Sequence, residues 1–207
     1  MRQCAARPFG RRWRDCSIDE GANMTAAENS TLRLFFAASP DAATRGRIAA
    51  AADALMLGPA ARPVPCGNYH VTLAFVGEIA APLLPTLLEI GSAQRIPSFS
   101  LRFAAYEYWP KPEVVVAAAR AIPPALGQLW QQLHRELAAH QWALDPKRLR
   151  PHVTLARKVS QAPVLQAMSS IDWPVREFCL MRSDTSGVQA AYTVVDTWSL
   201  LYDAAET

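Results

Sequence analysis

The chain has 207 residues, of which 51% are apolar and 19% charged, so its composition excludes an intrinsically disordered protein. Its length allows one domain or two small lobes, and either can bury a substantial core. The net charge of +3 suits an anionic partner without requiring one, because dedicated nucleic-acid binders usually carry a denser basic surface. No apolar run approaches the ~20 residues that span a bilayer, so we expect no transmembrane helix and no membrane partner.

The cysteines bear on metal binding and on the compartment. They are far apart in the sequence and form no Cys-x-x-Cys pair, which indicates neither a zinc site nor a disulfide framework. A reducing cytoplasm is therefore the expected location. The four positions are Cys4, Cys16, Cys66 and Cys179.

Residues 1–24 differ from the rest of the chain, because they are rich in arginine, lack apolar periodicity and contain no acidic residue before Asp15. An Arg-rich, acid-poor segment is compatible with an organellar transit peptide, but this one has no clear amphipathic pattern. It also lacks the apolar stretch of a secretory signal. We favour a disordered basic extension, or an upstream start codon with Met24 as the effective beginning. The arginines are Arg2, Arg7, Arg11, Arg12 and Arg14.

Ordered structure is expected from about Leu32 onward, where an apolar and aromatic run is typical of a buried strand. Ser39 and Pro40 favour the start of a helix, and Gly58 ends the alanine-rich stretch that follows. In chain order the expected elements are a strand at 32–38, a helix at 40–57, a strand at 69–76, a helix at 82–93, strands at 99–109 and 114–119, a helix at 123–137, a strand at 151–156, a helix at 162–169, and strands at 175–181 and 192–201.

The order of these elements predicts the fold class. Strands and helices are interleaved, with consecutive strands near the end, which favours an α+β protein with antiparallel or mixed sheets over a doubly wound parallel sheet. The sequence contains neither Gly-rich phosphate loop of the nucleotide-binding folds, and we expect no cofactor. The helix at 123–137 carries an apolar stripe at three- and four-residue spacing, formed by Leu126, Leu129, Trp130, Leu133 and Leu137.

The tetrapeptide His-Val-Thr-Leu occurs twice, at residues 70–73 and 152–155, in runs that are typical of strands. Alternate side chains of a strand point to opposite faces, so each histidine shares a face with the threonine two residues later. The valine and the leucine then face a core. A single His-x-Thr is weak evidence, since a lone histidine on an apolar strand is more often structural. Repetition of all four letters favours a functional cleft between two related halves.

His70 and His152 suit the in-line opening of a cyclic phosphate, which needs a base on the attacking side and an acid on the leaving oxygen. Histidine has an unperturbed pKa near ~6.5, so one ring can be neutral while the other is protonated. Thr72 and Thr154 can donate hydrogen bonds to the non-bridging phosphate oxygens, where negative charge grows in the transition state. This chemistry requires no metal.

The chain resembles the two-histidine (2H) phosphoesterase superfamily, and within it the bacterial RNA 2′,3′-cyclic phosphodiesterases, also described as tRNA 2′-5′ ligases. The resemblance covers roughly residues 31–202. It implies one functional domain with a bilobal α+β fold, in which two pseudo-symmetric lobes of antiparallel or mixed sheets flanked by helices enclose a central cleft. The segments that carry it are 33–37, 68–77, 150–157 and 178–183.

The resemblance also implies an activity. Members hydrolyse a 2′,3′-cyclic phosphate at an RNA end to a 2′-phosphomonoester without a metal, and the ATP-independent reverse reaction forms a 2′-5′ linkage. His152 corresponds to the base that activates water, and His70 to the acid on the leaving 3′ oxygen. Arg157 corresponds to a phosphate-binding arginine, a role that suits the planar guanidinium fork. The expected partner is RNA with a cyclic phosphate terminus, such as a tRNA fragment, or a nucleoside cyclic phosphate, and we expect a monomer.

Other side chains near the motifs are candidates for the same site. Phe75 and Tyr69 flank the first motif, where aromatic rings can stack on a base. Strand alternation predicts that Phe75 faces the core, whereas Tyr69 sits at a strand edge and stays open. His134 and His140 are six residues apart on a helix, which prevents a shared metal, so both are interpreted as surface or packing residues. Arg182 is a further candidate phosphate contact.

Two alternative functions are kept. The first is the same chemistry on another substrate, such as a 2′-5′-linked oligonucleotide or ADP-ribose 1″,2″-cyclic phosphate, which a substrate panel would separate. The second is a catalytically silent RNA-binding module that kept the cleft. Two intact His-x-Thr motifs argue against it, and RNA binding that survives the double histidine substitution, without turnover in the parent, would support it.

Overall fold

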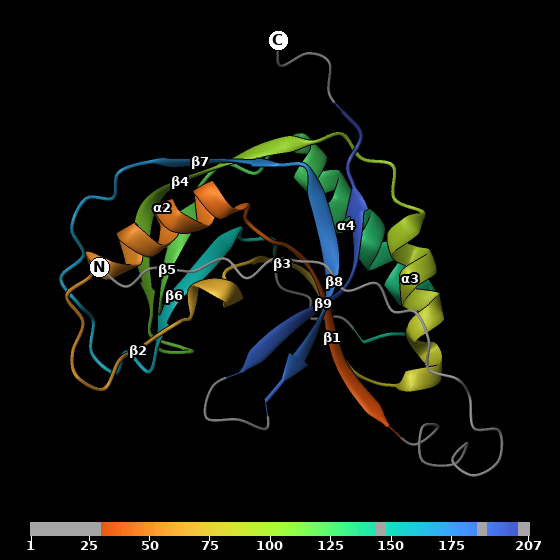
Figure 1. The fold of residues 1–207 in the computed structure, drawn as a ribbon, viewed down its shortest axis with the longest axis horizontal. Helices are drawn as coiled ribbons and strands as arrows, with labels where there is room; N and C mark the ends of the chain where they lie inside the picture. Colours follow the sequence, from red (N-terminus) through yellow and green to blue (C-terminus); the bar gives the residue numbers. More distant parts are fainter. Residues whose placement is uncertain (1–29, 144–147, 186–189, 203–207) are drawn as a thin grey trace.

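A computed structural model of the chain describes residues 30–143, 148–185 and 190–202, so the basic segment 1–24 lies outside the described residues. Two antiparallel sheets and three α-helices make up this part of the chain (Figure 1). The strands are β1 (Thr31–Ala38), β2 (Arg62–Pro63), β3 (Val71–Ala80), β4 (Phe99–Trp109), β5 (Val114–Ala119), β6 (His152–Arg157), β7 (Ile171–Val175), β8 (Glu177–Asp184) and β9 (Ala191–Ser199). The α-helices are α2 (Ala42–Asp53), α3 (Leu84–Ser92) and α4 (Pro124–Ala139).

Each sheet is covered by helices and forms one lobe. The four-stranded sheet has the order β3-β1-β8-β9, and the five-stranded sheet the order β2-β6-β5-β4-β7. Helices α3 and α4 contact the four-stranded sheet, and α2 crosses over to the other sheet, where it contacts β7. The Tyr106 hydroxyl of β4 donates a 2.8 Å hydrogen bond to the carbonyl oxygen of Ala51 in α2. The predicted bilobal α+β fold with antiparallel sheets is confirmed.

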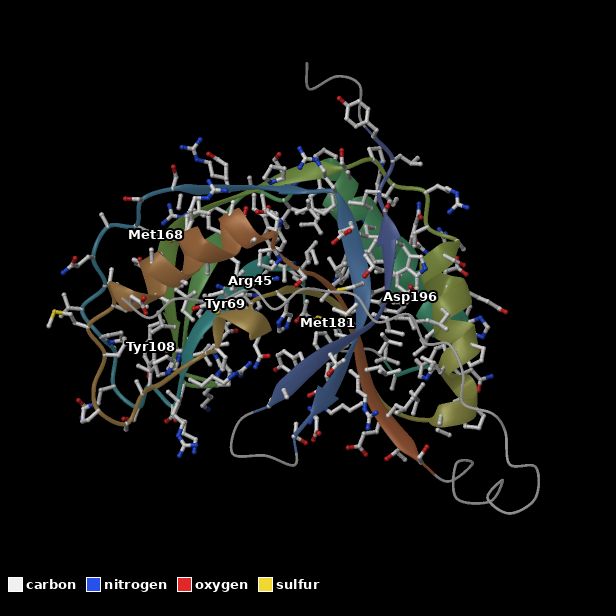
Figure 2. The ribbon with its side chains drawn as sticks, in the orientation of Figure 1. Arg45, Tyr69, Tyr108, Met168, Met181 and Asp196 are labelled. Carbon is white, nitrogen blue, oxygen red and sulfur yellow. The ribbon has the colours of Figure 1, made fainter. Side chains whose placement is uncertain are left out.

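A common apolar core supports both lobes. The leucines of the predicted helical stripe, at 126, 129, 133 and 137, are fully buried on α4. Burial along the whole length of β5 follows from its place between β4 and β6, and it explains the continuous apolar run Val-Val-Val-Ala-Ala-Ala. Figure 2 shows how densely side chains fill the space around the sheets. The strands that carry the repeated motifs, β3 and β6, are thus backed by packed apolar residues.

Three sequence predictions of local structure are wrong. No helix forms at 162–169. Leu165 and Met168 are partly buried against the core, but Pro163 lacks a backbone N–H and Val164 is 90% exposed. Helix α2 starts later than predicted, with Asp41 rather than Ser39 as the N-cap, and ends at Asp53. The strand predicted at 175–181 is two strands, because β7 pairs with β4 in one sheet and β8 with β1 in the other.

Gly91→Ala is expected to destabilise the protein, because a Cβ at this position of α3 would overlap the indole of Trp198 on β9. Overpacking of this kind typically costs about 1–3 kcal/mol. Gly46→Ala in α2 is the matched control, since no atom lies within 4 Å of the added Cβ. Alanine should there raise stability by about 0.5–1 kcal/mol. Chemical denaturation followed by circular dichroism measures both changes, and a Gly91 variant as stable as the parent would contradict the contact.

Candidate active site

The two His-Val-Thr-Leu motifs lie where the two lobes meet. His70 immediately precedes β3, an edge strand of the four-stranded sheet, whereas His152 is the first residue of β6 in the other sheet. Strands β3 and β6 contact each other. The valine and leucine of each motif are buried and each histidine and threonine is partly exposed, as strand alternation predicts.

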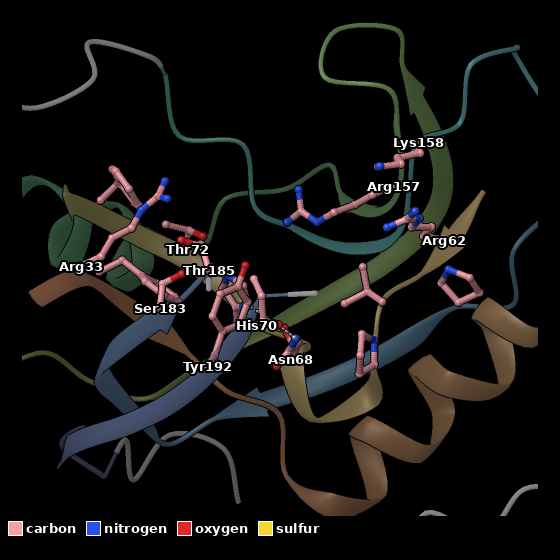
Figure 3. Close-up of a pocket in the computed structure, with 16 residues that line it drawn as sticks. Arg33, Arg62, Asn68, His70, Thr72, Arg157, Lys158, Ser183, Thr185 and Tyr192 are labelled. Atoms are coloured by element: carbon pink, nitrogen blue, oxygen red, sulfur yellow. Dashed lines mark hydrogen bonds between the residues drawn. The ribbon is translucent and has the colours of Figure 1, made fainter. Parts of the chain in front are cut away.

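Two adjoining cavities form one cleft around these motifs. The larger, of about 940 Å³, is lined by both histidines, both threonines and Arg157. The smaller, of about 460 Å³, is drawn in Figure 3. In the described part of the chain, neither cavity is lined by an aspartate or a glutamate, so the cleft has a positive character that suits an anionic ligand. The residues common to both cavities are His70, Thr72, Phe75 and Arg157.

A β-bulge in β3 places Phe75 in the cleft. The pairing of β3 with β1 shifts at Leu73, which has no partner of its own. Leu73 and Ala74 are consequently both buried, and Phe75 follows on the face of Thr72. The prediction that Phe75 packs in the core is therefore wrong, because its side chain is 44% exposed and lines both cavities.

The same irregularity in β6 places Arg157 in the cleft. The pairing of β6 with β5 shifts at Leu155, so that Leu155 and Ala156 are both buried. Arg157 then follows on the face of Thr154. The sequence places Arg157 beyond the end of the strand, but it is the last residue of β6. Arg157 and Phe75 thus hold equivalent positions, each five residues after the histidine of its motif.

Both imidazoles are held by the backbone in the same way. The Nδ1 atom of His70 lies 2.7 Å from the carbonyl oxygen of Asn68, and that of His152 lies 2.6 Å from the carbonyl oxygen of Arg150. A carbonyl oxygen only accepts hydrogen bonds, so Nδ1 carries the proton in each neutral ring. Each Nε2 then has a lone pair, with which it can accept a proton from a ligand in the cleft and later return it.

Aromatic rings surround His70. The ring centroids of Phe35 and Tyr192 lie 5.0 and 5.1 Å from that of His70, and the Tyr192 ring is perpendicular to it. Burial and, to a smaller extent, the charges of His152 and Arg157 together lower the pKa of His70 to about 4, although the Asn68 hydrogen bond opposes them. These surroundings therefore favour the neutral form of His70 near pH 7.

His152 lies instead against a small charged network. Its ring centroid is 4.4 Å from that of Trp109, and the guanidinium of Arg150 lies 4.3 Å from the same indole centroid. The Glu107 carboxylate accepts hydrogen bonds from Trp109 Nε1 at 2.9 Å and from Arg150 at 2.8 Å. Burial lowers the pKa of His152, and Arg150 and Arg157 lower it further, whereas the hydrogen bond to the Arg150 carbonyl and the charge of Glu107 raise it. Glu107 and Trp109 are not recognisable from the sequence as part of the site, because only the tertiary fold brings the end of β4 beside His152 and Arg150.

Burial decides two assignments that concern the cleft. Tyr69 is 3% exposed and belongs to the main apolar core, so its ring is not available for stacking on a base. Arg182 on β8 is exposed and does not line either cavity, whereas its neighbour Ser183 does. Successive residues of a strand point to opposite faces, so the proposal of Arg182 as a phosphate contact is not supported.

Helix α4 adds two rings to the cleft. Trp130, predicted to belong to the buried stripe, is partly exposed and lines the larger cavity together with His134. The two ring centroids are 4.0 Å apart, and Nδ1 of His134 donates to the Trp130 carbonyl oxygen at 2.8 Å. Their four-residue spacing was the available signal, since it places both rings on one side of a helix. His140 contacts Trp142 and does not line the cleft.

Metal binding and membrane insertion find no support in residues 30–143, 148–185 and 190–202. There, no three His, Cys, Asp or Glu side chains come together in an arrangement that could hold a metal ion. Within the same ranges, every helix is too short or too polar to cross a membrane.

A cleft between two antiparallel lobes, each of which supplies one His-x-Thr pair, defines a two-histidine phosphoesterase. The chain belongs to the 2′-5′ RNA ligase superfamily, whose profile matches residues 38–187. One relative, the RNA 2′,3′-cyclic phosphodiesterase of Escherichia coli (strain K12), is 31% identical over 170 residues, which are 81% of this chain and 96% of the relative. The RNA 2′,3′-cyclic phosphodiesterase of Thermus thermophilus is 31% identical over 180 residues, with 82% and 90% covered.

Solved structures agree with the family assignment. E. coli LigT complexed with 3′-AMP superposes with a TM-score of 0.77 at 30% identity, over 83% of this chain and 99% of LigT. A protein of T. thermophilus gives a TM-score of 0.71 at 28% identity, over 81% and 97% of the two chains. The resemblance inferred from the repeated motif is therefore confirmed at the level of family and fold.

Arg157→Gln is expected to raise the pKa of both His70 and His152, because the charge of Arg157 lowers both. Glu107→Gln is expected to lower the pKa of His152, because the carboxylate raises it. Titration of the imidazole resonances by NMR measures each change. Arg102→Gln is the control, since Arg102 lies outside the cleft with a 66% exposed side chain. An Arg157 variant in which neither pKa rises would contradict this electrostatic arrangement.

Proposed function

We propose that this chain hydrolyses 2′,3′-cyclic phosphates at RNA ends to 2′-phosphomonoesters, with His70 and His152 as the acid and the base. One observation carries the proposal. Two imidazoles, from two lobes, meet in one cleft, and each is bound through Nδ1 to a backbone carbonyl so that Nε2 is left for the ligand. An in-line displacement at phosphorus needs such a pair. The names of the curated relatives support the same activity.

The reaction follows from these positions. His152 removes a proton from water through Nε2, and the water oxygen attacks phosphorus. The bond from phosphorus to the 3′ oxygen breaks as His70 donates a proton to that oxygen, which leaves the phosphate on the 2′ oxygen. Thr72 and Thr154 donate hydrogen bonds to the non-bridging oxygens, and Arg157 offers its guanidinium fork to the same charge. Reversal of these steps forms a 2′-5′ linkage, with the two histidines exchanging roles.

Binding of the substrate favours the protonated form of His70, which the acid role requires. Both histidines have lowered pKa values in the empty cleft, and the charge of Arg157 contributes to both. A phosphate diester beside Arg157 adds a negative charge, which favours the protonated form of a nearby imidazole. Binding of the anion therefore lets His70 take up from solvent the proton that it gives to the leaving oxygen.

The proposal also covers the compartment, the oligomeric state and the metal requirement of the enzyme. We place the enzyme in the cytoplasm as a monomer, acting on RNA without a metal. The thiol of Cys179 is buried and donates a hydrogen bond to the carbonyl oxygen of Ala37, which fits a reducing compartment. The cleft draws both histidines and both threonines from one chain, which fits activity as a monomer.

Turnover of adenosine 2′,3′-cyclic phosphate in excess EDTA, with the 2′-phosphate as product, is the expected outcome for the parent protein. His70→Ala and His152→Ala should each lower kcat by about 10²–10⁴, since a placed acid or base contributes that much. His140→Ala, outside the cleft, is the control for removal of an imidazole. Activity abolished by the chelator, or a 3′-phosphate as the product, would contradict the mechanism. A panel with a 2′-5′-linked oligonucleotide and ADP-ribose 1″,2″-cyclic phosphate separates the alternative substrates.

The pH profile provides a second test. The productive complex carries one proton on the histidine pair, which the free enzyme takes up from solvent, and both pKa values are lowered from 6.5, that of His70 to about 4. The protonated fraction therefore falls as pH rises above neutrality, and kcat/KM should fall about tenfold per pH unit between about pH 7 and 9. Steady-state rates at substrate concentrations below KM measure this slope. A kcat/KM that stays level over the same range would show that no protonated histidine is required.

A further inference from the structure

Three cations gather at one end of the cleft, beyond the catalytic pair. Arg62 on β2 is the direct cross-strand partner of Arg157 on β6, and Lys158 follows Arg157 in the chain. Like charges directly opposite each other in a sheet destabilise it. Within the described ranges, no carboxylate forms an ion pair with any of the three and none lines the smaller cavity, so nothing in this part of the chain neutralises them.

The three cations lie at different distances from His70, with Arg157 nearest. In Figure 3, Arg157 extends from β6 toward Thr72 and His70, and Arg62 and Lys158 lie on its far side. All five line the same cavity. Arg157 is therefore placed to contact a phosphate at the catalytic pair, whereas Arg62 and Lys158 are placed for an anion that lies farther from it.

The opposite end of the cleft has a different character. The larger cavity is lined by the indoles of Trp109 and Trp130, and it also has cations of its own, Lys111, Arg148 and Arg150, of which Arg150 pairs with Glu107. Flat indole surfaces suit a base, whereas guanidinium and ammonium groups suit phosphate. The indoles therefore favour the larger cavity for the base of a nucleotide whose cyclic phosphate lies at the catalytic pair, which leaves the other side of its ribose toward Arg62 and Lys158.

We propose that Arg62 and Lys158 form a second phosphate subsite, which binds the phosphodiester one nucleotide upstream of the cyclic end. The inference rests on the proposed function and deepens it, because it makes the preferred substrate an RNA with at least one phosphate besides the cyclic one. An anion at this subsite offsets the repulsion between Arg62 and Arg157. A mononucleoside cyclic phosphate with a 5′-hydroxyl leaves the subsite empty and is used less efficiently.

Three substrates test the subsite. They are adenosine 2′,3′-cyclic phosphate with a 5′-hydroxyl, the same compound with a 5′-phosphate, and a diadenosine dinucleotide that ends in the cyclic phosphate. The parent should show a kcat/KM about ten to a hundred times higher for the last two, because charge-assisted hydrogen bonds to one phosphate contribute about that factor. The advantage should shrink as salt concentration rises, as expected for contacts between cations and phosphate.

Arg62→Gln and Lys158→Gln should each lower the ratio of dinucleotide to mononucleotide kcat/KM by about tenfold. Arg102→Gln, a charge removed from the same sheet but outside the cleft, should leave the ratio unchanged. Circular dichroism of each variant checks that the fold is kept. Equal kcat/KM for the three substrates in the parent, or an equal loss on all three in the Arg62 and Lys158 variants, would overturn the subsite. The absence of turnover on every cyclic phosphate would instead refute the proposed function.

Discussion

Both motif strands bury two successive apolar residues, Leu73 with Ala74 and Leu155 with Ala156, and the cleft depends on this constraint. Regular alternation would turn the residue five places after each histidine into the core. The bulge reverses that outcome, so that the histidine, the threonine and a third side chain face the cleft in each lobe. In one lobe the third side chain is Phe75 and in the other it is Arg157. Two copies of one local backbone irregularity therefore give the cleft a cation on one side and an aromatic ring on the other.

The sequence predicted much of what depends on local pattern, although the N-cap of α2 and the helix at 162–169 were predicted wrongly. The repeated tetrapeptide, the burial of its valines and leucines and the leucine stripe of α4 were all predicted correctly. Other predictions were wrong where the position of a side chain depends on pairing between strands that are distant in the sequence. The bulge that turns Phe75 outward is visible only in the register of β3 against β1. The network joins Glu107 and Trp109 of β4 to Arg150, which precedes β6 and is far from them in the sequence.

The two histidines have the same hydrogen-bond geometry but different surroundings. Aromatic rings enclose His70, whereas His152 is next to an indole that is itself bonded to a carboxylate. The electrostatic influence of Glu107 on His152 has no counterpart among the groups that act on His70. Burial lowers the pKa of both, and the surrounding cations do the same, so the empty cleft disfavours protonation of either ring. The asymmetry between the lobes thus lies in their neighbours rather than in the motifs.

Strand β1 lies between β3, which follows it closely in the sequence, and β8, which is separated from it by some two thirds of the chain. During synthesis the first of these pairings can form early, but one edge of β1 stays open until residues 177–184 leave the ribosome. Pairings of such sequence separation are slow to form, because loop closure has to precede them. An apolar edge of β1 therefore stays unpaired while the intervening residues are synthesised, and the lobe that carries His70 is completed only once β8 has emerged.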